Sequence, residues 1–171
     1  MKIIVQPDAG AVPVIAAIKH ARKSVDILIF RLDRKEVAEG LAAAVKRGVA
    51  VRALIAHTNR GGEKNLRKLE MRLLEAGVTV ARTADDLVRY HGKLMIIDRR
   101  QLHLYGFNYT WLDMQHSRSF GVVTRNKRFV NEALKLFANL RIVNQQLPAR
   151  PRDERGQPIA RIFRADHEPL V

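Results

Sequence analysis

Short apolar runs alternate along the first half of the chain with longer segments in which apolar residues recur every three or four positions. The runs are rich in Val, Ile and Leu, which predicts strands, and the longer segments carry the stripe of an amphipathic helix. Gly48 and Gly77 each follow such a segment, where glycine commonly ends a helix. This alternation predicts an α/β domain with a mainly parallel sheet flanked by helices. Strands are expected at 2–6, 24–32, 49–56 and 78–81, and helices at 11–22, 34–47 and 63–76.

The pattern changes in the second half. Strand-like runs at 93–97, 102–105 and 120–124 have no full-length helix between the first two, and one more amphipathic helix is expected at 129–140. The sheet is therefore expected to be mixed as well as mainly parallel. Residues 146–171 hold four of the six prolines and alternate Arg with acids, which is typical of a tail or linker. One domain over 1–145 and a tail over 146–171 are predicted.

The charge balance indicates what kind of partner the chain meets. The sequence has 171 residues, with 31 Lys and Arg against 17 Asp and Glu, which gives a formal net charge of +14. A field of this sign attracts polyanions such as nucleic acid, anionic lipid headgroups or phosphate esters. No apolar run is long enough for a signal peptide or a membrane span. A cytoplasmic or peripheral membrane location is therefore expected.

The absence of cysteine removes several kinds of site. With no Cys in the sequence, a disulfide scaffold, a thiolate zinc site and a cysteine nucleophile are all excluded. No His or acid pair falls at a metal-ligand spacing, so no metal is expected. Gly61 and Gly62 precede a helix but lack the spacing of a nucleotide-binding fingerprint, and they are interpreted as a flexible segment.

The segment 90–110 holds the sharpest local pattern. His91 and Lys93 are two residues apart at the start of a strand, so their side chains share one face and one small volume. Asp98 follows at an odd offset from His91, which favours a role in locking the turn that follows it over contact with substrate. Asn108 comes after the next strand, and a hairpin would return it to the level of His91.

These offsets resemble the signature of the phospholipase D superfamily, His-x-Lys-x4-Asp-x6-Gly-Ser-x-Asn. The matching residues are His91, Lys93, Asp98 and Asn108, while Tyr105 and Gly106 stand at the Gly and Ser positions. The resemblance implies an α/β/α sandwich and phosphodiester chemistry that needs no cofactor. It also implies that Asp98 belongs to the catalytic signature.

The resemblance further implies a mechanism. His91 would attack phosphorus and form a phosphohistidine, while the His of a second copy of the motif protonates the leaving oxygen. Lys93 and Asn108 would stabilise the charge on the non-bridging oxygens. In the family an acid about eleven residues after the Asn often orients the His, and Ser119 stands there. Asp113 or Asp26 could replace that acid in space.

Other side chains are candidates for contacts with the substrate. Gly106, Ser119, His57 at the end of a strand, and His116 after the motif are assigned to substrate binding. The remaining histidines, His20, His103 and His167, are expected at the surface. An aromatic cluster after Asn108 is either core or a contact beside the site, and it consists of Phe107, Tyr109 and Trp111.

Only one motif is present where the family chemistry uses two. The chain would pair with a second copy of itself, or with a second repeat of a longer chain. Single-repeat members of the family tend to be nucleases, and two-repeat members include phospholipases and cardiolipin synthase-like transferases. The first hypothesis is hydrolysis or transfer of a phospholipid phosphodiester, with peripheral membrane contact. The alternatives are a metal-independent nuclease and a weakly active member that binds nucleic acid or membrane, the latter because of Tyr105, Gly106 and Ser119.

Overall fold

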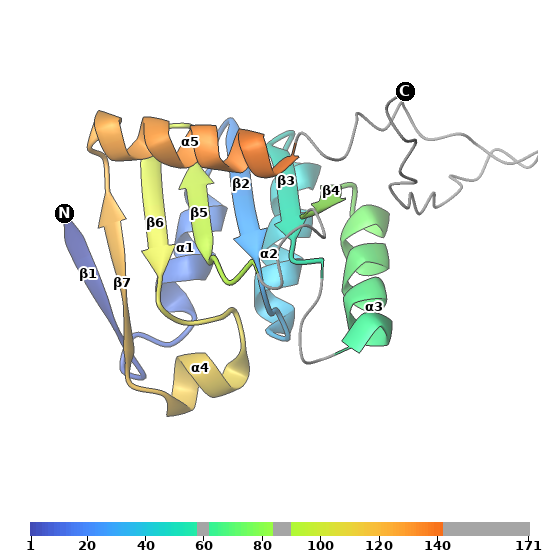
Figure 1. Cartoon of the computed structure of the whole chain (residues 1–171), viewed down its shortest axis with the longest axis horizontal. Coiled ribbons are helices and arrows are strands. Elements are labelled where there is room, and N and C mark those ends of the chain that lie inside the picture. The colour runs from blue at the N-terminus through green and yellow to red at the C-terminus, as the bar shows by residue number, and fades with distance from the viewer. Residues whose placement is uncertain (58–61, 84–89, 142–171) are drawn as a thin grey trace, which may run out of the picture.

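The computed structural model describes residues 1–57, 62–83 and 90–141, which form a seven-stranded mixed sheet with helices on both faces (Figure 1). The predicted order of strands and helices is present, and so is one helix that the sequence pattern did not predict, α4. The elements are β1 (Lys2–Gln6), α1 (Val12–His20), β2 (Ser24–Ile29), α2 (Lys35–Lys46), β3 (Ala50–Ile55), α3 (Gly62–Glu75), β4 (Thr79–Arg82), β5 (Leu94–Ile97), β6 (Gln101–Tyr105), α4 (Trp111–His116), β7 (Ser119–Thr124) and α5 (Lys127–Arg141).

The strand order is β1-β7-β6-β5-β2-β3-β4. Strands β2, β3 and β4 are parallel, whereas the other four of the six neighbouring pairs are antiparallel. The sheet is mixed, as predicted, but the expectation that it is mainly parallel is wrong. The turn between β5 and β6 is too short for the crossover that a parallel pair requires. Strand β1 also pairs with β7 at the sheet edge and not with its neighbour in sequence, β2.

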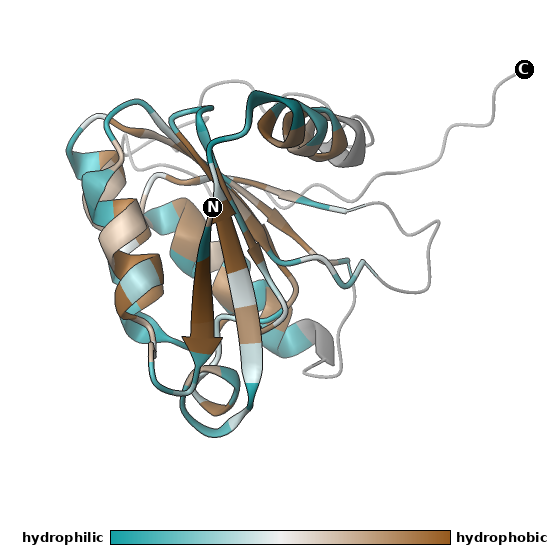
Figure 2. Ribbon diagram, turned by 90° about the vertical axis from the view of Figure 1, so that its left-hand side faces the viewer, coloured by the Kyte–Doolittle hydropathy of each residue, from teal (hydrophilic) through white to brown (hydrophobic). Residues whose placement is uncertain are grey.

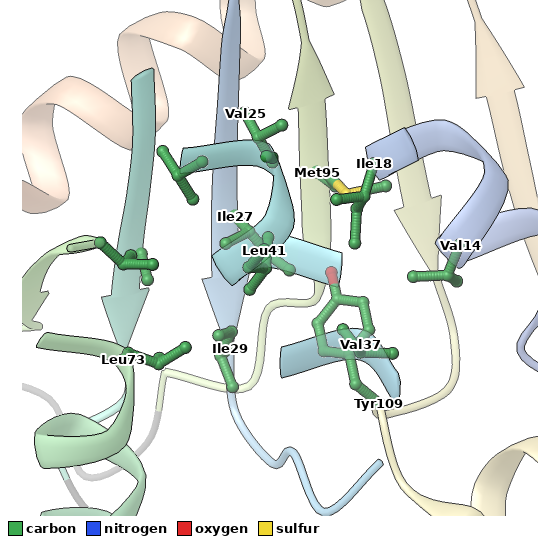
Figure 3. Packing of buried hydrophobic residues seen from close by; sticks show 14 of the residues in the cluster. Val14, Ile18, Val25, Ile27, Ile29, Val37, Leu41, Leu73, Met95 and Tyr109 are labelled. Atoms are coloured by element: carbon green, nitrogen blue, oxygen red, sulfur yellow. The ribbon is translucent and has the colours of Figure 1, made fainter. Parts of the chain in front are cut away.

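Each face of the sheet has its own apolar core. On one face, helices α1, α2, α3 and α4 pack on side chains such as Ile27, Ile29 and Met95, and Ile18 and Leu41 of the helices are fully buried (Figure 3). On the other face α5 buries Val130 and Phe137 against β2, β3, β5 and β6. Figure 2 shows the sheet from its β1 edge, with helices on either side.

The described helices do not include one that is both long enough and apolar enough to span a bilayer. The predicted tail, residues 146–171, lies outside the described residues, as do His167 and Gly61.

Candidate active site

One edge of the sheet gathers most of the polar side chains that the sequence singled out. Strands β2, β3, β4 and β6 end at this edge, and β5 and β7 begin there. The segments that continue from these strand ends carry His57, His91 and Asn108. The ends of parallel strands are common places for ligand groups, because loops there are free to present side chains.

His91 and Lys93 lie together at the start of β5, as their spacing predicts. The Lys93 Nζ is 3.1 Å from Nδ1 and 3.0 Å from Nε2 of His91. The Lys93 side chain is only 6% exposed, whereas His91 is exposed to solvent. A buried ammonium group therefore lies directly beneath an imidazole that a substrate can reach.

Phe30 supports this pair. It follows β2 directly, and its ring meets the His91 ring edge-on with centroids 4.6 Å apart. The Lys93 Nζ is 5.4 Å from the centroid of the same ring, a distance at which a cation is attracted to an aromatic face. Gly92 permits the close approach to β2, because a Cβ there would lie 2.6 Å from Leu28 Cδ2.

Asn108 is held in place by Asp113. The Asn108 backbone N–H and side-chain Nδ2 donate to one oxygen, Asp113 Oδ2, at 2.6 and 2.8 Å. Asp113 lies in the first turn of α4, whose N-terminus is capped by the Thr110 hydroxyl. The amide group has a second N–H, and its Oδ1 is buried with no hydrogen-bond partner among the described residues.

The loop that carries Asn108 is fixed to the strands on either side. Tyr109 N donates to Arg31 O at 3.1 Å, and its carbonyl accepts from the backbone of residues 33 and 34. The buried Tyr109 hydroxyl donates to Leu94 O at 3.1 Å, at the start of β5. Tyr105 N donates to Lys93 O at 2.9 Å. Asn108 is thereby placed at the same edge of the sheet as His91, as the hairpin geometry predicts.

The two acids considered as partners for His91 have other partners. Asp113 accepts from Asn108, and Asp26 is fully buried in the middle of β2, where it forms an ion pair with Arg52 under α5. Asp26 lies opposite Ile96 and is too far along β2 to orient His91, whereas a role of Asp113 toward His91 stays a prediction. The register between β2 and β3 places Asp26 opposite Arg52. This pairing could not be predicted from the sequence, because the two residues are 26 positions apart in the chain.

Asp98 lies at the opposite end of β5 from His91. Its carboxylate accepts backbone N–H bonds from Arg22, Lys23 and Ser24, the shortest of 2.6 Å from Lys23. Burial opposes ionisation of this group, but the backbone donors outweigh it and lower its pKa below the ordinary 3.8. The position predicted as catalytic thus holds the α1–β2 connection, and not the turn after β5 that its offset suggested it would lock.

The structure brings Gly106 and Ser119 together where β6 ends and β7 begins. A Cβ on Gly106 would lie 2.9 Å from Ser119 Oγ and 3.0 Å from the Phe120 carbonyl oxygen. Tyr105, at the position of the family glycine, is paired with Gly121 on β7, where a Cβ would lie 2.7 Å from the Tyr105 ring. The two residues that depart from the family signature therefore lie against small residues of β7: Tyr105 against Gly121, and Gly106 against Ser119.

The other histidines have separate environments. His57 donates its backbone N–H to Thr83 Oγ1 at 2.9 Å, and the ring of exposed His116 packs on Trp111 with centroids 4.2 Å apart. These contacts do not test a role in substrate binding, so the assignment of His57 and His116 to substrate binding stays a prediction. His20 is exposed, as expected.

His103 is not a surface residue, contrary to expectation. It is 4% exposed, its Nδ1 lies 3.0 Å from the Tyr105 hydroxyl, and desolvation lowers its pKa to about 4. Of the aromatic cluster after Asn108, Phe107 and Tyr109 are core residues, whereas Trp111 is half-exposed. His103 is buried because it lies on the same face of β6 as Tyr105, which belongs to the larger apolar core.

Two features of the site were missed from the sequence, the Phe30 support and the Asp113 bond to Asn108. Phe30 could have been found, because it directly follows a strand that ends at the site edge. Asp113 had no such signal, because α4 has only six residues and no clear periodicity. Among residues 1–57, 62–83 and 90–141, no group of three His, Asp or Glu side chains is placed to hold a metal ion.

Comparison with solved structures shows where this fold occurs. The chain superposes on Nuc, a phospholipase D family member from Salmonella typhimurium, with a TM-score of 0.74 at 21% identity, over 81% of this chain and 91% of that one. NucT from Helicobacter pylori gives 0.67 at 18% identity, over 81% and 93%. Polyphosphate kinase from Porphyromonas gingivalis gives 0.68 at 21% identity, over 87% of this chain but only 27% of that one. At these identities the likeness establishes the fold alone.

A comparison with curated proteins gave no match. The model of one protein family, described as the cardiolipin synthase, phospholipase D-like domain, matches residues 14–141, which include the β5–β6 hairpin and the loop that carries Asn108. With that match over most of its length and with the phospholipase D fold, the chain belongs to the phospholipase D-like family.

Proposed function

We propose that this chain cleaves phosphodiesters by forming a covalent phosphohistidine on His91. The observation that carries the proposal is the exposed His91 ring, which lies on the buried Lys93 ammonium at 3.0 Å, at the sheet edge that also holds Asn108. A nucleophile and two donors for phosphate oxygens are thereby supplied by one short hairpin and its following loop. Membership of the phospholipase D-like family supports the same chemistry.

The first step makes one bond and breaks one. A neutral ring nitrogen of His91 attacks phosphorus, and the bond from phosphorus to the leaving oxygen breaks with its electron pair. Negative charge grows on the non-bridging oxygens, where the Lys93 ammonium and the Asn108 amide N–H stabilise it. In the second step a water or alcohol oxygen attacks the phosphohistidine, loses its proton, and releases His91.

A poor leaving group needs a proton, and His91 cannot provide it while acting as nucleophile. A second motif would supply that proton, either from another copy of this chain related by a twofold axis or from a second repeat. The same acid, once deprotonated, would accept the proton of the incoming water. The proposal therefore includes a site formed by two motifs.

The substrate is chosen so that attack by His91 can be tested separately from the need for a second motif. Bis(p-nitrophenyl) phosphate releases p-nitrophenolate, a stable anion that leaves without being protonated. A single motif should therefore release one p-nitrophenolate per chain in a rapid burst, even without a second motif. Two motifs should give sustained turnover, because the second step needs a base.

The experiment compares the wild-type chain with His91→Ala in excess EDTA. The wild type should show at least the burst, and His91→Ala should show neither burst nor turnover. His20→Ala, which removes an exposed histidine on α1, serves as the matched control. A burst that persists in His91→Ala, no burst from the folded wild type, or release that depends on an added divalent cation would contradict the proposal.

A further inference from the structure

A groove opens beside the candidate active site, between the segment after β2, helix α3 and the start of α4. It has a volume of about 550 Å³, and Arg31, Asn65, Lys68 and Arg72 form its polar wall, with Leu66 and Leu69 among its apolar lining residues. We refer to it as the α3–α4 groove. This volume lies within the roughly 300–1,000 Å³ of sites that enclose one small ligand.

The groove and the site share their supports. Arg31 directly follows Phe30, whose ring packs on His91. Asp113 lines the groove and also holds Asn108 through its Oδ2. A ligand in the groove would therefore continue directly into the volume where the reacting phosphodiester lies under the proposed function.

The cations of the groove have no carboxylate partners among the described residues. Arg31, Lys68 and Arg72 take part in none of the ion pairs there, although Arg34 and Arg82 nearby are paired with Glu36 and Glu70. The buried Nε of Arg31 has no hydrogen-bond partner within the described part of the chain.

The two acids of the groove are already engaged. Asp33 Oδ1 accepts from Trp111 N at 2.7 Å, and Asp113 Oδ2 accepts from Asn108. Lys68 and Arg72 are also one helical turn apart on α3, so two like charges stand side by side on one wall. An anionic ligand would relieve that repulsion.

We propose that the α3–α4 groove binds a single strand of nucleic acid next to the phosphodiester that His91 attacks. This inference rests on the proposed function, since it names the substrate class of the same site. Arg31, Lys68 and Arg72 would bind successive backbone phosphates, and Leu69 and the exposed Leu112 would lie against sugars or base faces. A positively charged groove that follows the backbone is one of the usual means of binding single strands.

The placement of these cations favours a strand over a lipid surface. Arg31 is only partly exposed on the groove wall, where an extended strand can reach it, whereas Lys68 and Arg72 are exposed and open to either partner. The volume fits one or two nucleotide units and not a duplex. The net charge of +14 would in addition attract any polyanion to the chain, without distinguishing between the two.

Binding can be measured apart from catalysis. In a His91→Ala background, fluorescence anisotropy with a labelled eight-nucleotide oligothymidylate would report the affinity without cleavage. Lys68→Ala/Arg72→Ala should weaken binding about 10- to 100-fold, and should reduce the slope of log K against log salt by about 1.4, since each phosphate contact to a single strand contributes about 0.7. Both side chains are exposed, so their replacement does not disturb the core.

The matched control is Lys127→Ala/Arg128→Ala, which removes two exposed cations from the start of α5 on the other face of the sheet. It should change the affinity less than about threefold, because these cations are remote from the groove. Equal weakening in both double variants would overturn the proposal, since attraction would then follow net charge alone. No weakening in the groove variant would overturn it as well.

A second arm tests lipid. Sedimentation with phosphatidylglycerol vesicles should be weakened equally by the groove and control pairs. A loss of vesicle binding confined to the groove pair, with oligothymidylate binding unchanged, would assign the groove to lipid and contradict the proposal. None of these results depends on turnover. Failure of the groove proposal is therefore distinguishable from failure of the proposed function, which the p-nitrophenolate burst reports separately.

Discussion

The two ends of strand β5 carry residues of the same family signature, yet they differ in what those residues contact. At the start of β5, Lys93 lies buried beneath the exposed ring of His91, so the pair is open to a substrate. At the other end, Asp98 accepts three backbone N–H groups of the α1–β2 connection. A four-residue strand thus separates the proposed chemistry of His91 and Lys93 from the structural role of Asp98. Residues of one signature therefore need not share one role.

A carboxylate holds backbone N–H groups near each end of β5. Asp113 uses one oxygen for two N–H groups of Asn108, much as Asp98 uses its carboxylate for residues 22–24. The difference lies in what each one holds, because Asn108 is proposed as a donor to the substrate and the α1–β2 connection is not. Disruption of the two acids should therefore affect different observables. Substitutions at four positions, His91, Asp113, Asp98 and Gly106, test the contrast between the two ends of β5 in order of expected effect.

The largest effect is expected for His91→Ala. Turnover of bis(p-nitrophenyl) phosphate should fall by about 10⁴-fold or more, because loss of a covalent nucleophile removes the reaction path. The free energy of unfolding should change by less than about 0.5 kcal/mol, because the ring is exposed. Steady-state rates and urea unfolding measure the two quantities. A large loss of stability together with activity would mean that this end of β5 is also structural.

Asp113→Ala should come next. Without its carboxylate, Asn108 loses the acceptor of both N–H groups, and kcat should fall about 10- to 100-fold, below the roughly 10²–10³ of a deleted oxyanion donor. Asp113→Asn should recover most of the rate, because both bonds fall on a single oxygen that an amide also provides. Equal rates in Asp113→Ala and the wild type would show that Asn108 does not need this support.

Asp98→Ala should act mainly on stability. Three backbone N–H groups would lose their acceptor, which predicts a loss of about 2 kcal/mol in the free energy of unfolding. Turnover per folded molecule should change far less than in Asp113→Ala. If the opposite pattern were measured by urea unfolding and rates at saturating substrate, Asp98 would belong to the chemical end after all.

The Asp98 contribution should also depend on pH in a defined direction. Because its folded pKa is below the ordinary 3.8, the stabilisation is fully present above that pH and is lost as pH falls through the folded pKa. The gap in unfolding free energy between the wild type and Asp98→Asn should therefore be constant above about pH 5 and narrow below about pH 4. A gap that widened on acidification would contradict the assigned role.

The smallest effect is expected for Gly106→Ser, which restores the family residue. The new Cβ would lie 3.0 Å from the Phe120 carbonyl oxygen, which is backbone and cannot rotate away. Overpacking of this kind costs about 1–2 kcal/mol. Adding Ser119→Gly should recover part of that loss, because the Ser119 Oγ is the other close atom, at 2.9 Å. Higher turnover in Gly106→Ser without a loss of stability would show that Gly106 weakens the site.

Local pattern in the sequence predicted those parts of the fold that local physics decides. The order of strands and helices, the shared face of His91 and Lys93, and the return of Asn108 to the site edge all follow from side-chain periodicity and hairpin geometry. These features depend on residues that are close in the chain.

The features that the sequence did not predict depend mostly on contacts between residues far apart in the chain. Pairing of β1 with β7 joins residues such as Ile4 and Gly121, and the Asp26–Arg52 ion pair depends on strand register. The surface position expected for His103 is wrong because His103 shares a face of β6 with Tyr105, which belongs to the larger apolar core. The six residues of α4 are too few for a helical pattern, so the support of Asn108 by Asp113 remained hidden.

The most direct test of the covalent role of His91 is to find the adduct itself. Wild-type chain mixed with bis(p-nitrophenyl) phosphate in EDTA, quenched at alkaline pH within the burst and digested, should yield a peptide containing His91 with one added p-nitrophenyl phosphoryl group. The adduct should be absent from His91→Ala. An adduct on a different residue, or a burst with no adduct on the His91 peptide, would contradict the assignment of the start of β5 as the chemical end.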